Sequence, residues 1–308
     1  MRYVRCVILR PLDWPSNRPP EPRIHSTMSD QSISNSDLGR LRNLIHAQAG
    51  IRLGPDKKTM LELRIRPRLR SLALNSYREY CDYVFSVQGQ RDEMVHLLDA
   101  VSTNKTDFFR EPAHFEYLIG KALPEILKDN RCGRPVSVWS AGCSSGEEPY
   151  TLSMVLSEYV REHSDFRFKV LATDLCTEVL AKARLAIYDN GAVQPVPIEL
   201  RCRYFLRSRE QGSNRWRIAP EIRNLVEFRH LNFMDPDFGA METVEIIFCR
   251  NVIIYFDRST QEQLLQKLAK QLVPGGYIFL GHSETLHGLD APLAPMGPAV
   301  YRKIDAST

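Results

Sequence analysis

The sequence predicts an α/β protein with a doubly wound, mostly parallel sheet, preceded by a small all-helical domain. Three observations lead to this prediction. Residues 36 to about 102 show helical spacing of apolar residues, whereas short β-branched runs alternate with longer helical stretches from residue 136 onwards. A glycine- and serine-rich loop, residues 141–146, follows the first of those runs directly. Doubly wound sheets bind ligands at such loops.

The first 31 residues differ from the rest of the chain. The stretch "PLDWPSNRPPEPRIHSTMSDQ" is rich in proline and polar residues and has no period, so we expect a disordered extension over residues 1–31. The apolar run before it, "VRCVILR", is too short and too interrupted by arginine for a signal peptide. Both Met1 and Met28 remain possible starts of translation.

Residues 32–102 are expected to form the helical domain. The stretch "SDLGRLRNLIHAQAG" begins with a Ser or Asp cap and should end at Gly50. The next helix contains Pro67, which should kink or restart it. Two further helices, "SYREYCDYVFSVQ" and "RDEMVHLLDAVS", complete a small bundle. The apolar positions expected at helical spacing in the second helix are Met60, Leu63, Leu69 and Leu72.

A linker segment, residues 103–120, leads into a second domain at 121–304. Its alternating pattern predicts βαβ units. The predicted strands are 136–140, 169–173, 226–230, 244–249 and 277–281. The predicted helices are 147–162, 177–187 and 260–272. Residues 190–225 break this rhythm and are expected to form a hairpin-sized insertion.

Composition places the chain among globular proteins without a long membrane segment. Hydrophobic residues make up 43% and charged residues 25% of the sequence, and no apolar run is long enough to span a bilayer. The seven cysteines form no C-x-x-C pair. This argues against a disulfide framework or a zinc site and predicts free thiols in a reducing cytosol.

Positive charge is concentrated in the helical domain. The net charge of the chain is +4, but residues 36–75 alone carry nine basic and three acidic side chains. Such a local excess favours an acidic partner, although a basic run is also commonly just a solvated face. Arg64 and Arg68 are four residues apart and share one helical face, which supports a binding role.

The loop "WSAGCSSGEEPY" does not fit a phosphate ligand. Its glycines lack the G-x-G-x-x-G spacing of dinucleotide sites, and no lysine is present as in a P-loop. Glu147 and Glu148 at its rim would repel a pyrophosphate but suit S-adenosyl-L-methionine, which carries an ammonium and a sulfonium. Asp174, at the end of the next strand, could take both ribose hydroxyls. The alternative is a tight turn followed by a helix-capping glutamate pair.

Three long stretches resemble the CheR family of chemotaxis receptor methyltransferases: "TNKTDFFREPAHF", "WSAGCSSGEEPYTLSMVL" and "IIFCRNVIIYFDRSTQEQLLQKLAKQLVPGGYIFLGHSETL". The resemblance covers roughly residues 36–304. It implies a class I S-adenosylmethionine-dependent methyltransferase fold with an inserted β-subdomain at about 190–225. It also implies formation of glutamate methyl esters on cytoplasmic receptor helices, with S-adenosyl-L-homocysteine as the product. A cytoplasmic monomer without bound metal is expected.

The resemblance also assigns residues. The cofactor positions of the family match Asn104, Thr106, Arg110, Glu148, Asp174, Asn232, Phe233, Arg250 and Asn251. Arg110 and Tyr255 match positions expected to orient the incoming carboxylate. The receptor-contacting positions match Arg64, Arg68 and Arg70, although Pro67 stands where relatives often have another arginine. "FLRSREQGSNRW" lacks the glycine-x-glycine turn of those members that bind a receptor pentapeptide, so we expect no dependence on that peptide.

Less specific interpretations remain for several of these residues. Arg110 and Arg250 could form structural ion pairs, and Tyr255 could be a core aromatic. His282 and His287 are expected in a loop role, because no carboxylate or cysteine has ligand spacing to them. Two rival functions also remain, a methyltransferase acting on nucleic acid and a non-catalytic module that binds the cofactor or a cyclic nucleotide.

Overall fold

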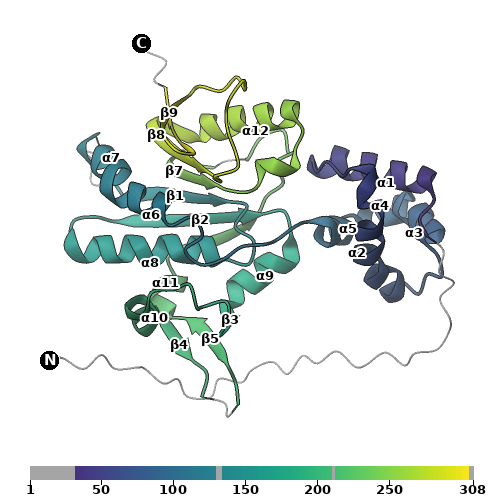
Figure 1. Cartoon of the computed structure of the whole chain (residues 1–308), viewed down its shortest axis with the longest axis horizontal. Helices are drawn as coiled ribbons and strands as arrows, with labels where there is room; N and C mark the ends of the chain where they lie inside the picture. Colours follow the sequence, from purple (N-terminus) through teal and green to yellow (C-terminus); the bar gives the residue numbers. More distant parts are fainter. Residues whose placement is uncertain (1–31, 130–133, 210–211, 240, 305–308) are drawn as a thin grey trace. The chain divides into compact units, whose positions relative to one another are not determined.

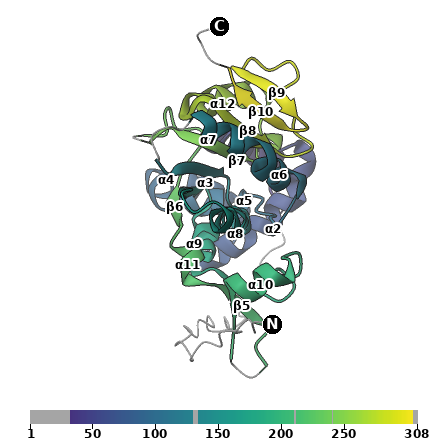
Figure 2. The ribbon, with the colours of Figure 1, turned by 90° about the vertical axis from the view of Figure 1, so that its left-hand side faces the viewer.

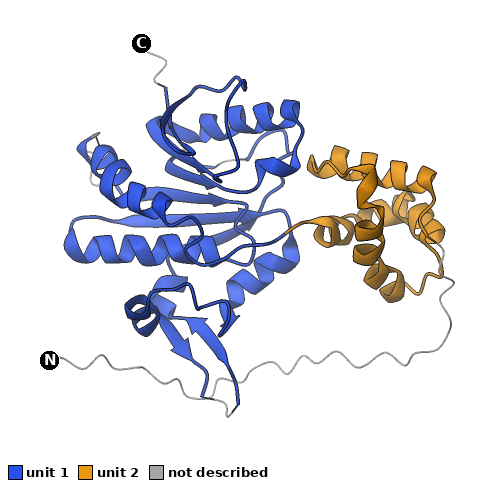
Figure 3. Cartoon of the chain, viewed as in Figure 1, with its two compact units in different colours: residues 1–10, 104–308 blue, residues 11–103 orange. Residues whose placement is uncertain are grey.

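The computed structural model describes residues 32–129, 134–209, 212–239 and 241–304. These residues form two compact units, a helical unit up to Thr103 and a larger α/β unit from Asn104 onwards (Figures 1 and 3). The extension expected at residues 1–31 lies outside the described residues. Within the described residues, no helix combines the length and the apolar character needed to cross a bilayer. Cys81, Cys143, Cys176, Cys202 and Cys249 form no disulfides.

The helical unit begins with a well-capped helix. The N–H of Asp37 donates to the Ser34 hydroxyl (3.0 Å), and Gly50, with φ of 70°, donates its N–H to the carbonyl of His46. The predicted end at Gly50 is confirmed, whereas the cap is Ser34 rather than a residue inside the predicted stretch. The helices are α1 (Asn35–Ala49), the 3-10 helix η1 (Pro55–Lys57), α2 (Lys58–Ser71), α3 (Tyr77–Val84), α4 (Val87–Asp92) and α5 (Met94–Val101).

Helix α2 differs from its sequence-based description in two ways. It continues through Pro67 as a single helix, and Pro67 is exposed, so the carbonyl that loses its N–H partner lies toward the solvent side. The buried positions of α2 are Leu61, Ile65 and Leu69, each four residues apart and therefore on one face. Leu63, expected in the core, is 61% exposed.

The α/β unit is built on a seven-stranded sheet of order β6-β2-β1-β7-β8-β10-β9. The first five strands in this order pair in parallel, and β10 and β9 add antiparallel strands at one edge, coloured yellow in Figure 2. The strands are β1 (Val136–Ala141), β2 (Phe168–Asp174), β6 (Val226–His230), β7 (Val244–Cys249), β8 (Leu272–Leu280), β9 (Leu293–Gly297) and β10 (Val300–Lys303). The five predicted strands are thus present, and the α/β fold class is confirmed.

Helices cover both faces of this sheet. Leu152 and Leu156 of one helix pack with Val138 on one face, whereas Leu265 of another packs with Trp139 on the opposite face. The alternation of Val138 and Trp139 along β1 follows the period of two of a strand. The helices are α6 (Ala113–Tyr117), the π-helix η2 (Leu118–Ala122), α7 (Leu123–Asp129), α8 (Glu147–Glu162), α9 (Thr177–Leu185), the 3-10 helix η3 (Ile253–Tyr255) and α12 (Arg258–Gln271).

The insertion forms a separate three-stranded antiparallel sheet of order β3-β5-β4. Its elements are β3 (Ile187–Asp189), α10 (Ile198–Tyr204), β4 (Phe205–Arg207), β5 (Arg215–Ile218) and α11 (Pro220–Arg223). Phe108 of the linker segment packs edge-on against Tyr188 and Phe205, with ring centroids 4.9 and 5.5 Å apart. The linker therefore ties this β-subdomain to the rest of the α/β unit.

Candidate active site

The loop between β1 and α8 turns sharply at two glycines. Gly142 and Gly146 have φ of 90° and 98°, in the left-handed region that favours glycine. A Cβ on Gly142 would lie 2.5 Å from Cγ2 of Val252, and one on Gly146 would lie 3.0 Å from the Tyr188 hydroxyl. Two neighbouring segments therefore pack against the loop at Gly142 and Gly146, and neither position has room for a side chain.

The same loop is fastened to the end of β2. The N–H groups of Gly142 and Cys143 both donate to the carbonyl of Thr173, at 2.8 and 2.9 Å. The hydroxyl of Thr173 accepts from the indole N–H of Trp139 (2.9 Å), and both side chains are buried. Strand pairing and these bonds together fix the glycine loop at the carboxyl edge of the sheet, where doubly wound folds bind ligands.

Asp174, the last residue of β2, lies beside this loop. Its Oδ2 accepts from the N–H of Ser144 (2.8 Å), and its Oδ1 accepts from the N–H of Cys176 (2.9 Å). The Ser144 hydroxyl in turn donates to the carbonyl of Asn104 (2.9 Å). The half-buried carboxylate of Asp174 is thus oriented by backbone donors next to the linker residue Asn104.

The two glutamates that follow the loop are buried, at 7% exposure each. From the sequence they were expected at the rim of the site, but this is wrong, because the first turn of α8 turns them inward. The Ser145 hydroxyl donates to Glu147 (2.7 Å), and burial raises the pKa of Glu147 to about 6. Glu148 accepts from the Ser140 hydroxyl (2.7 Å) and from Arg250 Nε (2.6 Å).

Arg250 makes a buried ion pair with Glu148. Its side chain is 2% exposed, its Nη1 also donates to the carbonyl of Arg110 (2.6 Å), and its guanidinium lies over the ring of Phe115 at 5.2 Å. A buried pair of this kind fixes geometry more than it adds stability. Arg250 and Glu148 therefore join β7, α8 and the linker segment under the glycine loop.

The linker segment carries unusual backbone angles around Arg110. Phe109 and Glu111 both have φ of 55°, a conformation that costs energy for residues with a Cβ and that clusters at functional sites. The Arg110 side chain is half-exposed and donates to the carbonyl of Lys105 (3.1 Å). Thr106 is also half-exposed in this segment.

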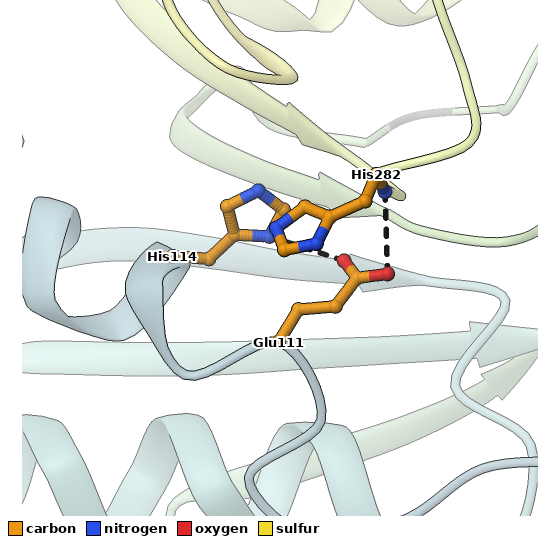
Figure 4. Close-up of side chains that lie close together, drawn as sticks. All are labelled: Glu111, His114 and His282. Carbon is orange, nitrogen blue, oxygen red and sulfur yellow. Dashed lines mark hydrogen bonds and ion pairs between the residues drawn. The ribbon is translucent and has the colours of Figure 1, made fainter.

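The side chains of Glu111, His114 and His282 lie close together (Figure 4). Their side-chain ligand atoms lie within 4.8 Å of one another, and the backbone N–H of His282 donates to Glu111 Oε1 (3.2 Å). However, Arg250 Nη1 lies 3.6 Å from Glu111 Oε2 and 3.4 Å from His114 Nδ1. A divalent ion would be repelled by that guanidinium, so the geometry favours an ion-pair network over a metal site.

This cluster also changes the description of His282. Sequence spacing offered no carboxylate partner for it, but the fold brings Glu111 to it from 171 residues away. Burial and the neighbouring Arg250 lower the pKa of His114 to about 4, so His114 is neutral near pH 7. His287 lies exposed in the loop after β8, in agreement with the expected loop role.

Two more predicted residues follow β6. The Leu231 N–H donates to the carbonyl of Asp174 (3.0 Å), which places the end of β6 beside the end of β2. The next residue, Asn232, accepts from the N–H of Met234 (3.0 Å), and the Phe233 ring contacts Phe238 edge-on at 6.1 Å. Asn232 and Phe233 thus lie at the same sheet edge as Asp174.

The loop after β7 carries Asn251 and Tyr255. Asn251 has φ of 59°, and Tyr255 is half-exposed in η3. The carboxylate of Glu284 accepts from the N–H groups of Asn251 (2.8 Å) and Ile254 (3.3 Å). Glu284 was not singled out in the sequence, although it lies within the stretch "GHSETL"; only the fold shows what it holds.

In the helical unit, two of the three predicted receptor contacts bind other residues of the same unit. Arg68 makes two hydrogen bonds to buried Glu93, at 2.8 and 2.7 Å. Arg64 donates to the carbonyls of Val101 (2.5 Å) and Ser102 (2.8 Å). They do share a face of α2, but that face is turned toward α5. Arg70 is exposed.

Comparisons with known proteins agree with this architecture. Residues 36–102 match the model of the CheR methyltransferase all-alpha domain, and residues 104–300 match that of the CheR methyltransferase SAM binding domain. A chemotaxis protein methyltransferase of Borreliella burgdorferi is 36% identical over 88% of this chain and 95% of its own. One of Escherichia coli K12 is 35% identical over 88% and 91%, and chemotaxis protein methyltransferase 2 of Pseudomonas aeruginosa is 35% identical over 87% and 93%.

Proposed function

Since the chain belongs to the CheR methyltransferase family, we propose that it methylates glutamate side chains of chemotaxis receptors. The chain is an S-adenosylmethionine-dependent methyltransferase of chemotaxis signalling. The proposed reaction moves the methyl group from the sulfonium of S-adenosyl-L-methionine to a carboxylate oxygen. A carbon–sulfur bond breaks, an ester bond forms, and S-adenosyl-L-homocysteine leaves. We further propose that the reaction takes place in the cytoplasm, where the signalling helices of receptors lie.

The donor set at the carboxyl edge fits this cofactor. Asp174 offers a carboxylate next to a glycine loop that contains no lysine, as a ligand with ribose hydroxyls and positive charge requires. We propose that Asn104, Asp174, Asn232 and Phe233 bind the nucleoside end. Thr106, Arg110 and Asn251 are proposed to contact the remainder. The Asp174 carboxylate, held by two backbone N–H groups at the end of β2, is the single observation that supports this assignment best.

Glu148 and Arg250 are proposed to act mainly by positioning. Their ion pair is buried and connects the glycine loop, the linker and β7. We propose that this pair supports the site from below rather than at its rim, by holding the first turn of α8 against β7 and the linker.

The substrate carboxylate needs no general base. A glutamate has a reference pKa of about 4.3 and is anionic at neutral pH. Catalysis should therefore come mainly from alignment, which contributes up to about 7–11 kcal/mol in favourable cases. We propose that Arg110 and Tyr255 orient the incoming carboxylate by hydrogen bonds. They come from the linker and from η3.

The receptor surface is proposed to lie on the exposed face of α2. Arg70 and Leu63 lie on that face, and an exposed arginine suits an acidic receptor helix. Arg64 and Arg68 could reach a receptor only by giving up bonds inside the helical unit. We therefore assign the direct contact to Arg70 and a supporting role to the other two.

The test is a transfer assay with S-adenosylmethionine carrying a labelled methyl group. The protein is incubated with receptor-containing membranes, with the same membranes lacking receptor, and with RNA. Label on receptor that is released by mild base supports a carboxyl methyl ester. Base-stable label on receptor, label on RNA, or no transfer at all would contradict the proposal.

A further inference from the structure

We propose that Glu284 is a positioning residue that sets the cofactor-side conformation of the loop after β7. This inference rests on the proposed function only in assigning Asn251 and Tyr255 to the site. Glu284 is 5% exposed and lies in the loop after β8. It contacts neither the linker segment nor the glycine loop through any hydrogen bond among the described residues. It acts through the backbone of its neighbours.

The carboxylate of Glu284 accepts hydrogen bonds from backbone N–H groups of two loops. Oε2 accepts from the N–H groups of Gly281 (2.6 Å) and Asn251 (2.8 Å), and Oε1 accepts from that of Ile254 (3.3 Å). No ion pair to a cationic side chain is present within the described residues. A buried carboxylate without a cationic partner is costly unless such donors surround it, so these N–H groups must stay in place around it.

The loop that Glu284 holds is also constrained elsewhere. Asn251 adopts φ of 59°, a conformation that needs support in a residue other than glycine. A Cβ on Gly281 would lie 2.9 Å from the Asn251 nitrogen and 3.0 Å from its Cγ. The two loops therefore approach so closely that only glycine fits at residue 281. They start side by side, because Cys249 and Leu280 pair at the ends of β7 and β8.

The position of this loop is transmitted to the glycine loop by direct packing. Val252 lies in the chain between Asn251 and Ile254, whose N–H groups donate hydrogen bonds to Glu284. Its Cγ2 occupies the space that a Cβ of Gly142 would need. A shift of the loop after β7 would therefore move Val252 against Gly142, as well as displacing Asn251 and Tyr255.

Glu284→Gln is the first variant for the test. It keeps the length of the side chain but replaces one acceptor oxygen by a donor that faces backbone N–H groups. We expect the dissociation constant for S-adenosylhomocysteine, measured by calorimetry, to rise about 10- to 100-fold. Glu284→Asp keeps the charge but cannot span both loops, and should give an intermediate loss. If Glu284→Gln does not fold, the cofactor affinity of Glu284→Asp serves as the test.

Glu158→Gln is the matched control. Glu158 accepts from Arg203 and Tyr204 on the far side of α8, so its loss should lower stability while leaving cofactor affinity unchanged. If Glu284 has only a structural role, Glu284→Gln will behave like this control. Its unfolding midpoint will fall, but the folded variant will keep the wild-type affinity and the wild-type KM for the cofactor. That result would overturn the inference.

The calorimetric measurement uses no receptor, so it does not depend on the acceptor. If the wild-type protein binds S-adenosylhomocysteine but methylates no receptor, the proposed function fails while the inference about Glu284 is still tested. In a receptor assay with wild-type activity, Glu284→Gln should raise KM for the cofactor and lower kcat, with KM for the receptor unchanged. A change in receptor KM alone would also contradict the proposed role.

Discussion

Asp174 is expected to serve both the cofactor and the loop that holds it. In Asp174→Asn, one oxygen is replaced by an amide donor, which opposes the N–H of either Ser144 or Cys176. Loss of a charged hydrogen bond costs about 1.5–3 kcal/mol, so affinity for S-adenosylmethionine should fall roughly 10- to 100-fold. Calorimetry checks this.

Asp189→Asn is a suitable control for that measurement. Asp189 also accepts from a backbone N–H, that of Ala192 (2.9 Å), but it is exposed in the β-subdomain. Its substitution should leave the affinity unchanged. Equal affinities for wild type and Asp174→Asn would remove Asp174 from the site.

At the residue scale, a polar residue at the end of a strand can be predicted from the sequence, whereas the residue that it contacts in the fold cannot. Asp174 could be placed because it directly follows a predicted strand. The burial of Glu148 could not, since its partner Arg250 is 102 residues away. The same holds for Glu111 and His282, which only the completed sheet brings together.

At the scale of single elements, α2 gives a prediction that separates its arginines. Arg70→Ala should reduce receptor methylation severalfold and make it less sensitive to salt, because an exposed charge facing an acidic partner is lost. Neither the unfolding midpoint nor cofactor affinity should change, because Arg70 is exposed and its side chain makes no hydrogen bond or ion pair with any other described residue. Initial rates at several salt concentrations measure this.

Arg68→Ala provides the contrast. It leaves Glu93, which is 1% exposed, without its charged partner. The helical unit should lose roughly 3–5 kcal/mol of stability, detectable by urea unfolding. If Arg70→Ala methylates receptors at the wild-type rate with wild-type salt dependence, the exposed face of α2 is not the receptor surface.

The hairpin of β4 and β5 gives a second prediction at this scale. Gly212 has φ of 83°, but Ser208 and Arg209 occupy part of the turn where pentapeptide-binding members have a glycine-x-glycine sequence. Glu210 lies outside the described residues. An added peptide strand needs close backbone approach, so a receptor C-terminal pentapeptide should show no micromolar binding in calorimetry.

A gain-of-binding variant sharpens that measurement. S208G combined with E210G restores the glycine-x-glycine pattern and should increase peptide binding. Micromolar binding of the peptide to the unmodified protein would show that the prediction is wrong.

Prolines explain why the sequence did not predict the two strands at the C-terminal edge of the sheet. β9 and β10 lie in a stretch with Pro292, Pro295 and Pro298, and proline within an apolar run argues against a strand. The sheet tolerates these residues because β9 is an edge strand. Four of the five predicted strands, β2, β1, β7 and β8, lie inside the sheet, where burial favours apolar runs. The fifth, β6, is an edge strand without a buried residue.

At the scale of the whole molecule, two buried groups make the stability depend on pH in opposite directions. The pKa of Glu147 is raised by burial from 4.5 to about 6, so its stabilising contribution is present below pH 4.5 and lost as pH rises through 6. The pKa of His114 is lowered by burial from 6.5 to about 4. Its contribution is present above pH 6.5 and lost as pH falls through 4.

Glu147→Gln should remove the loss of stability that Glu147 causes as the pH rises. In the cofactor-free protein, the stability of the variant relative to wild type should rise by about 2 kcal/mol between pH 4.5 and 7. Urea unfolding followed by circular dichroism at several pH values measures the difference. A constant difference for Glu147→Gln would mean that Glu147 titrates normally in the folded protein.

The bond between Trp139 and Thr173 has an optical consequence. Trp139 is the only tryptophan buried among the described residues, and its indole N–H donates to the residue whose carbonyl receives the N–H groups of Gly142 and Cys143. A ligand that alters the glycine loop would alter the polarity around this indole. The colour and quantum yield of its fluorescence would then report occupancy of the site, without any dye or label.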